Sequence, residues 1–117
     1  VKPKLIIERA IPLVNTLREK NPNTPIIFVD LFKSPITLLN SKAKSENEAM
    51  DNALKVEFNE MIENGYKNIY LIETPKLADS DHEGTVDSIH FTDLGFLRYA
   101  DFLISQFRTL GLLAYLN

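Results

Sequence analysis

Residues 21–30 read NPNTPIIFVD, a turn sequence that leads directly into a short apolar run. Asparagine and proline in alternation are typical of a turn and end any helix that precedes them. The apolar run, Ile26–Asp30, is rich in β-branched residues, as are strands that are buried on both faces of a parallel sheet. A second run of this kind, NIYLIE, lies at Asn68–Glu73. The two runs predict two buried strands.

A helical pattern precedes the first strand. Leu5–Lys20 carries apolar residues at the spacing of one helical face, and Pro12 within it predicts a kink or a restarted helix. The apolar positions are Ile6, Ile7, Ala10, Leu13, Val14 and Leu17.

Two further helices are predicted, one between the strands and one after them. Ser45 and Glu48 match a capping box that opens a helix to Asn64, with Gly65 as its stop. Thr92 is the expected N-cap of the last helix, which Gly111 ends. The expected core positions are Met50, Ala53, Leu54, Phe58 and Met61 in the first, and Phe96, Ala100, Leu103, Phe107 and Leu110 in the second. Arg98, Asp101, Ser105 and Arg108 form the opposite, polar face of the last helix.

Alternation of helices and strands predicts an α/β fold with a parallel sheet and crossover helices. Two parallel strands do not form a stable sheet alone, because independent stability takes about three or more strands. We therefore expect residues 1–117 to be the C-terminal portion of one larger domain. The missing strands would come from an N-terminal half, a separate chain or a second copy.

Composition excludes several function classes. A net charge of −3 gives no electrostatic basis for binding nucleic acid or an anionic membrane surface. No apolar run approaches the roughly 18 residues that span a bilayer. The absence of cysteine excludes disulfides and thiolate metal sites.

The stretch EGTVDSIHFTDLGFLRYAD, residues 83–101, carries the chemistry of the chain. Asp87 stands three residues before His90, in a polar loop that follows the second strand. Loops at the carboxyl ends of parallel strands are where α/β proteins place their active sites. An acid beside an imidazole is the base half of a nucleophilic catalytic site, since the carboxylate orients the ring and stabilises its protonated form.

This stretch resembles the C-terminal catalytic segment of the SGNH (GDSL-type) serine hydrolases. The resemblance rests on Asp87-x-x-His90, on the Thr92-Asp-Leu-Gly that follows it, and on Arg98 in the next helix. The upstream Glu83–Val86 and the earlier segment Glu8–Val29 are also similar to members of this family. Phe91 departs from the proline common there, a difference expected to affect loop stiffness more than chemistry.

The resemblance implies that His90 is the general base and Asp87 its orienting partner. It implies a flavodoxin-like three-layer α/β/α sandwich, of which this chain is the C-terminal half. The implied function is that of a serine ester hydrolase (an acylhydrolase or esterase) acting on a small-molecule or carbohydrate ester, as in carbohydrate deacetylation. No cofactor is implied. Related esterases are often exported, which implies a periplasmic or secreted location, although the residues themselves indicate no compartment.

The family's Gly-Asp-Ser nucleophile segment and its Gly and Asn oxyanion donors are not found in this sequence. The chain alone is therefore expected to be inactive. Ser34, Ser80 and Ser88 lack the tight, glycine-flanked turn that exposes a nucleophile, and are expected to be ordinary loop residues.

Three other interpretations remain open. The acidic loop could be a solvated surface segment. It could bind a divalent cation through Asp79, Asp81, His82, Glu83, Asp87 and His90. The whole chain could be a non-catalytic association module that pairs its sheet edges with another chain.

Overall fold

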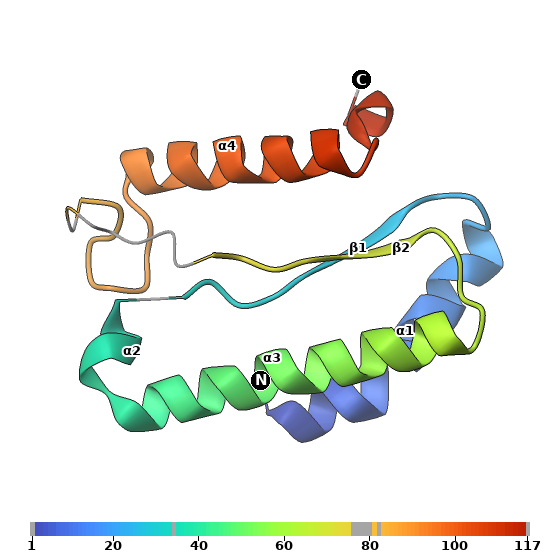
Figure 1. Cartoon of the computed structure of the whole chain (residues 1–117), viewed down its shortest axis with the longest axis horizontal. Coiled ribbons are helices and arrows are strands. Elements are labelled where there is room, and N and C mark those ends of the chain that lie inside the picture. The colour runs from blue at the N-terminus through green and yellow to red at the C-terminus, as the bar shows by residue number, and fades with distance from the viewer. Residues whose placement is uncertain (1, 34, 76–80, 82, 117) are drawn as a thin grey trace. The chain divides into compact units, whose positions relative to one another are not determined.

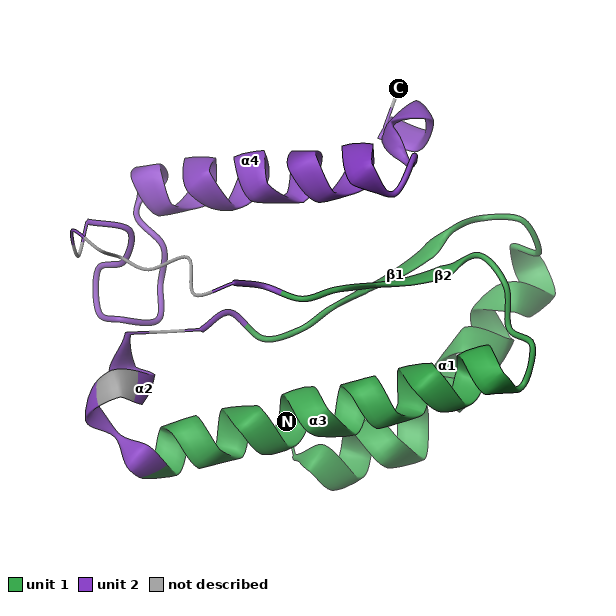
Figure 2. Ribbon diagram, viewed as in Figure 1, with its two compact units in different colours: residues 1–31, 42–73 green, residues 32–41, 74–117 purple. Residues whose placement is uncertain are grey.

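The computed structural model describes residues 2–33, 35–75, 81 and 83–116. The elements in chain order are α1 (Pro3–Lys20), β1 (Ile26–Val29), α2 (Ile36–Leu39), α3 (Ser41–Glu63), β2 (Ile69–Ile72), α4 (Asp93–Thr109) and the 3₁₀ helix η1 (Leu113–Leu116) (Figure 1). They form two compact units (Figure 2). Unit 1 comprises Val1–Leu31 and Lys42–Glu73, and unit 2 comprises Phe32–Ser41 and Thr74–Asn117.

The sheet of unit 1 is parallel, as predicted. β1 pairs with β2 in a register that sets Ile26 opposite Ile69 and Val29 opposite Ile72. Parallel strands need a crossover connection, and α3 with the short α2 before it supplies one. The carboxyl ends of both strands therefore lie at the same end of the sheet, from which the chain enters unit 2.

The core of unit 1 lies between the sheet and two helices, which cover the same face of the sheet (Figure 1). Val14 from α1, Met61 from α3 and Ile69 from β2 are buried together. Phe28 and Phe58 pack against this cluster, and their rings meet edge to face at a centroid distance of 6.4 Å. The apolar faces of α1 and α3 thus form one shared layer that packs against the strands.

The prediction that both strands are buried on both faces is wrong for β1. Ile69 and Ile72 of β2 are buried, but Val29 of β1 is 37% exposed. Among the described residues, β2 is the only strand beside β1. An apolar groove lined by Phe28 and Val29 opens at β1, where a further strand or helix would cover these side chains. A second groove, between α1 and α3, adjoins it at Phe28.

Two helix predictions also need correction. α1 is one continuous helix through Pro12, so of the two outcomes predicted there the restart is wrong and the kink stays a prediction. Only Ala10 and Val14 are buried on this helix, whereas Leu13 is 53% exposed. α3 begins at Ser41 and not at the predicted capping box of Ser45. Ser45 lies about one turn inside the helix and therefore does not cap it. The predicted stop holds, since α3 ends at Glu63, shortly before a glycine with positive φ.

Unit 2 is built on α4. Thr92 caps this helix as predicted, with its hydroxyl accepting a hydrogen bond from the amide of Gly95 at 3.1 Å. The predicted core face is only partly correct, because Phe96 is 60% exposed, whereas Phe107 is half-buried. No helix formed by the described residues is long and apolar enough to cross a bilayer.

Candidate active site

The candidate site is a tight loop just before α4, in unit 2. The amide of Val86 donates to the carbonyl of His90 at 2.8 Å, which closes the loop over the three residues between them. Ser88 lies at its turn with a φ of 68°, in the left-handed region that non-glycine residues seldom adopt. An antiparallel β-bridge between Thr85 and Phe91 pairs the residues just outside this closed loop. These contacts bring both ends of Asp87–His90 together.

The loop places the carboxylate of Asp87 against the imidazole of His90. Oδ2 of Asp87 lies 2.7 Å from Nδ1 of His90. Oδ1 accepts two backbone hydrogen bonds, from the amide of His90 at 2.8 Å and from that of Ile89 at 3.0 Å. One oxygen therefore fixes the carboxylate while the other holds the ring, and a proton on Nδ1 leaves Nε2 as the basic nitrogen.

These hydrogen bonds stabilise the ionised carboxylate. The amide of His90, then its ring, then the amide of Ile89 lower the pKa of Asp87 from 3.8 to about 2. Asp87 is thus an anion throughout the neutral range. A fixed negative charge beside the ring is what an orienting carboxylate needs.

Titration of the Asp87 carboxyl carbon by NMR is expected to give a midpoint near 2 in the folded chain and near 3.8 in the urea-unfolded chain. Because the folded pKa is the lower one, the loop's stabilisation is complete above about pH 4 and is lost as the pH falls through about 2. A folded-state midpoint close to the unfolded one would show that the amides do not hold the carboxylate.

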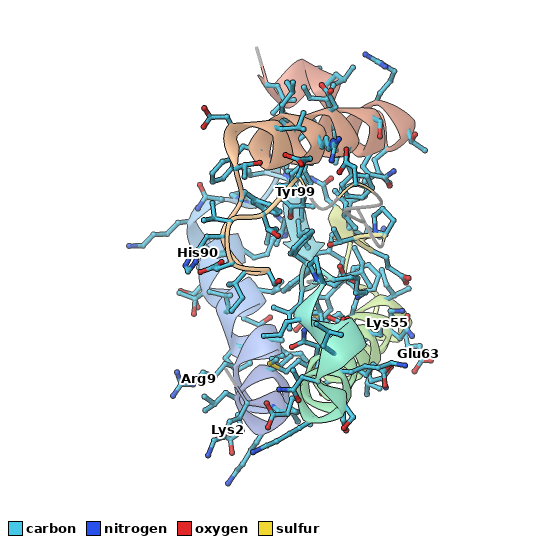
Figure 3. The ribbon with its side chains drawn as sticks, turned by 90° about the vertical axis from the view of Figure 1, so that its left-hand side faces the viewer. Lys2, Arg9, Lys55, Glu63, His90 and Tyr99 are labelled. Carbon is cyan, nitrogen blue, oxygen red and sulfur yellow. The ribbon has the colours of Figure 1, made fainter. Side chains whose placement is uncertain are left out.

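His90 lies at the surface (Figure 3), with its side chain 77% exposed, and that of Asp87 is 52% exposed. Among the described residues, Nε2 of His90 has no hydrogen-bond partner. A general base must reach the hydroxyl that it deprotonates. The free and exposed nitrogen can therefore meet a nucleophile supplied from elsewhere.

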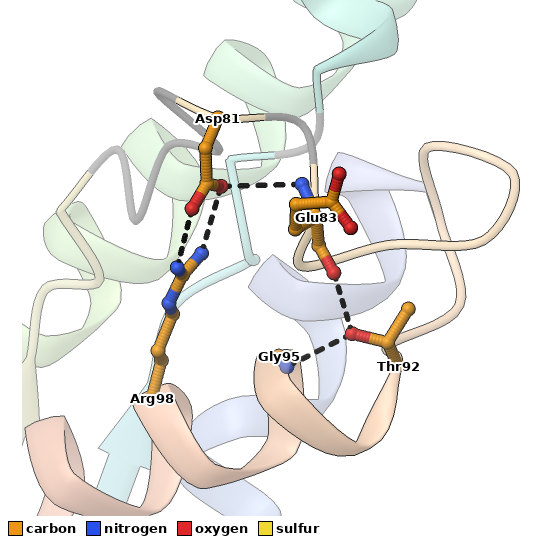
Figure 4. A network of polar contacts seen from close by, with 5 residues as sticks. All are labelled: Asp81, Glu83, Thr92, Gly95 and Arg98. Atoms are coloured by element: carbon orange, nitrogen blue, oxygen red, sulfur yellow. Dashed lines mark hydrogen bonds and ion pairs between the residues drawn. The ribbon is translucent and has the colours of Figure 1, made fainter.

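A second group of polar contacts joins this loop to α4 (Figure 4). Arg98 binds Asp81 through two parallel bonds, Nη1 to Oδ1 at 3.0 Å and Nη2 to Oδ2 at 2.6 Å. The amide of Glu83 donates to Asp81 Oδ1 at 3.2 Å, and the hydroxyl of Thr92 donates to the carbonyl of Glu83 at 2.7 Å. The guanidinium beside Asp81 holds the pKa of that carboxyl well below its usual range.

Gly95 allows the loop to approach the helix closely. A Cβ added at this position would lie 1.9 Å from the carbonyl oxygen of Gly84 and 2.9 Å from its carbon. The same Gly84 oxygen accepts a hydrogen bond from the amide of Thr92 at 3.0 Å. Loop backbone and helix backbone thus touch where any side chain would separate them.

The residue after His90 anchors the loop through its ring. Phe91 lies 4.6 Å from Phe32, 5.3 Å from Phe96 and 5.4 Å from Tyr99, measured between ring centroids. Aromatic pairs at these distances contribute beyond the area they bury. Phe91 is therefore the centre of an aromatic cluster in unit 2, a role that its position beside the histidine did not reveal.

Two comparisons with known proteins bear on the family of this chain. The sequence model of the GDSL-like lipase/acylhydrolase family matches residues 2–108. The chain belongs to this family. Among solved structures it is similar to a protein from Bacteroides ovatus that is assigned to the GDSL-like lipases, with 32% identity and a TM-score of 0.85 over 92% of this chain. No curated protein matches it.

The GDSL-like chain spans about a third of its structural neighbour, of which it covers 32%. The likeness confirms the predicted fold class, an α/β chain with part of the flavodoxin-like GDSL fold. It also confirms the resemblance that the sequence showed.

The structure of this GDSL-like chain brings Asp87 and His90 together, as the sequence analysis expected. The bond between Asp81 and Arg98 was not expected, because the sequence pattern indicated only that Arg98 lies on the polar face of its helix. One signal could have indicated it: the loop from Asp79 to Asp93 holds five acids and no basic residue, and Arg98 follows within two helical turns.

Four residues considered as nucleophiles or ligands, Ser34, Asp79, Ser80 and His82, lie outside the described residues. Ser88 is described, and it is the left-handed residue of the turn between Asp87 and His90. Within the part of the chain that the structure describes, no group of three or more His, Asp or Glu side chains could hold a metal ion.

Proposed function

We propose that this chain supplies the base half of a serine ester hydrolase and forms the C-terminal portion of its single domain. The observation that carries the proposal is the 2.7 Å contact between Asp87 Oδ2 and His90 Nδ1, in a loop that fixes the carboxylate by two amides. Membership of the GDSL-like lipase/acylhydrolase family supports ester hydrolysis as the chemistry.

The proposed reaction proceeds through an acyl-enzyme. A serine outside this chain attacks the acyl carbonyl while Nε2 of His90 takes its proton. His90 then returns that proton to the departing alcohol oxygen, leaving the acyl group on the serine. Water, deprotonated by the same nitrogen, attacks the acyl-enzyme; the bond from the acyl carbon to the serine oxygen breaks, His90 returns the proton to that oxygen, and the acid is released. Asp87 keeps its charge throughout, holding the Nδ1 proton and stabilising the imidazolium.

The nucleophile and the oxyanion donors lie outside this chain in the proposal. Amides aimed at the developing oxyanion are typically the largest single catalytic contribution. Without them and without the serine, residues 1–117 alone are expected to be inactive. The substrate is proposed to be a small-molecule or carbohydrate ester, with a small acyl group such as acetyl; family resemblance is the support for this.

The free edge of β1 is the proposed interface with the rest of the enzyme. Two grooves of about 270 and 250 Å³ adjoin β1, and both are lined by Ile6, Phe28 and Leu54. An edge strand with unpaired backbone groups and apolar cover is a template for a further strand. We propose that the remaining two thirds of the enzyme, for which the longer Bacteroides ovatus protein is the precedent, occupies this edge and completes the sheet. Below, "complete hydrolase" means this chain together with that part.

Native mass spectrometry after treatment with a fluorophosphonate probe tests this assignment. We expect the 13.3 kDa chain to be found with a second polypeptide segment that carries the adduct. Adduct on this chain itself would place the nucleophile among its own serines and would contradict the division of the site.

A second candidate function is a non-catalytic association module. The uncovered edge of β1 and its apolar grooves favour it, since they suit pairing with another chain whether or not catalysis occurs. A self-associated chain without adduct, in the same experiment, is the result this alternative expects.

A further inference from the structure

We propose that Arg98 is a positioning residue for the general base, acting through Asp81. This inference rests on the proposed function, because it concerns how the base is aimed at its nucleophile. Arg98 does not touch His90. It acts on the segment that leads into the loop, and its effect is on where the loop stands relative to α4.

Among the described residues, the pairing of Asp87 and His90 depends only on residues of its own loop. All three bonds to the Asp87 carboxylate come from Ile89 and His90. The geometry within the pair is therefore set locally. What remains to be set is the direction in which Nε2 of His90 points, and that depends on how the loop is attached to the helix.

The loop is attached to α4 by the ring of Phe91, which packs against Phe96 and Tyr99, and by a set of polar and backbone contacts. Thr92 donates from its amide to Gly84 and from its hydroxyl to Glu83. Because Gly95 has no side chain, the carbonyl of Gly84 can lie close to the helix backbone. The polar and backbone contacts hold Glu83 and Gly84, which stand two and three residues after Asp81, the partner of Arg98.

A guanidinium is better suited than an ammonium to hold the Asp81 carboxylate in one orientation. Its planar fork makes two parallel bonds to the carboxylate of Asp81, which fixes an orientation as well as a distance. The same carboxylate accepts from the amide of Glu83, so the fork is coupled to the loop backbone (Figure 4).

The ion pair between Arg98 and Asp81 can position the loop without adding much to stability. The side chains of Arg98 and Asp81 are 37% and 46% exposed. Exposed ion pairs contribute little to the free energy of unfolding, since solvent screens them. A pair of this kind can still decide catalysis, because a displacement of about 1 Å can reduce a rate about 100-fold.

The test compares Arg98→Gln, Arg98→Lys and the control Arg108→Gln in the complete hydrolase. Arg108 lies on the same helix, is exposed and forms no ion pair among the described residues, so its replacement changes the charge equally. With an aryl acetate as substrate, we expect Arg98→Gln to lower kcat about 10- to 100-fold with KM and Tm unchanged. Arg98→Lys should lie between wild type and Arg98→Gln, because it keeps the charge without the fork.

Backbone hydrogen exchange provides a readout that does not depend on activity. In the complete hydrolase, Arg98→Gln should exchange the Thr92 amide at least about tenfold faster, whereas Arg108→Gln should not. Equal kcat in Arg98→Gln and Arg108→Gln would overturn the inference, as would a loss of kcat matched by an equal loss of folded protein. If His90→Gln also retained full activity, the proposed function itself would be at fault, and the exchange result would still decide the role of Arg98 in holding the loop.

Discussion

Replacing His90 by Gln in the complete hydrolase is expected to lower kcat for an aryl acetate by about 10⁴-fold or more. Glutamine fills much of the same space, but it cannot take the proton of the attacking serine, so the nucleophile stays a neutral hydroxyl. The effect should appear in kcat and kcat/KM together, because the lost interaction belongs to the transition state. The loss is measured by steady-state hydrolysis and by the rate of labelling with a fluorophosphonate.

Stability should hardly change in the same variant. The side chain of His90 is 77% exposed, and surface substitutions usually shift the free energy of unfolding by less than about 0.5 kcal/mol. Asp101→Ala is the control: Asp101 is an exposed residue of α4 whose side chain forms no hydrogen bond or ion pair among the described residues. Full activity in His90→Gln would remove this histidine from the mechanism and with it the proposed division of the active site.

Gly95→Ala is expected to destabilise the chain by on the order of 1–3 kcal/mol and to displace the loop that carries the base. Alanine normally strengthens a helix by up to about 1 kcal/mol over glycine. Here the new Cβ would lie 1.9 Å from the carbonyl oxygen of Gly84, and backbone atoms cannot rotate away as a side chain can. The hydrogen bond from Thr92 to that oxygen should be lost with the close approach.

Urea unfolding of residues 1–117 measures this change, with hydrolysis by the complete hydrolase as the second readout. Asp101→Ala again serves as the control, since it also adds alanine to α4 but at an exposed position, where helix propensity should stabilise it slightly. If Gly95→Ala were as stable as Asp101→Ala, the contact between the loop and the helix would be looser than the structure shows.

The sequence predicted the features that short-range chemistry determines. The strands at Ile26 and Ile69, the Thr92 cap and the stop near Gly65 follow from local patterns of apolar, capping and turn residues. The pairing of Asp87 with His90 was predictable for the same reason, because only two residues separate them.

Features that depend on distant contacts were missed. Leu13 was placed on the apolar face of its helix by its spacing, yet it is exposed, because spacing identifies an apolar face without showing what covers it. The partner of Arg98 lies 17 residues away in the sequence. The local sequence pattern around a surface arginine is the same whether or not the arginine has such a partner. The burial of β1 depends on what lies beside its free edge, and none of the described residues forms a strand there. Such contacts are set by tertiary structure and leave little trace in the local pattern.

The closed turn from Val86 to His90 also bears on the order in which the enzyme would assemble. Every bond that pairs the acid with the ring lies within this turn, and short loops close at little entropic cost, on a time of about 10–100 ns for ten residues. The base should therefore be formed early in folding, before the slower pairing of sheet strands. Assembly of an active enzyme would then wait on the arrival of the nucleophile, and a split enzyme made from the two parts should recover activity at the rate at which they associate.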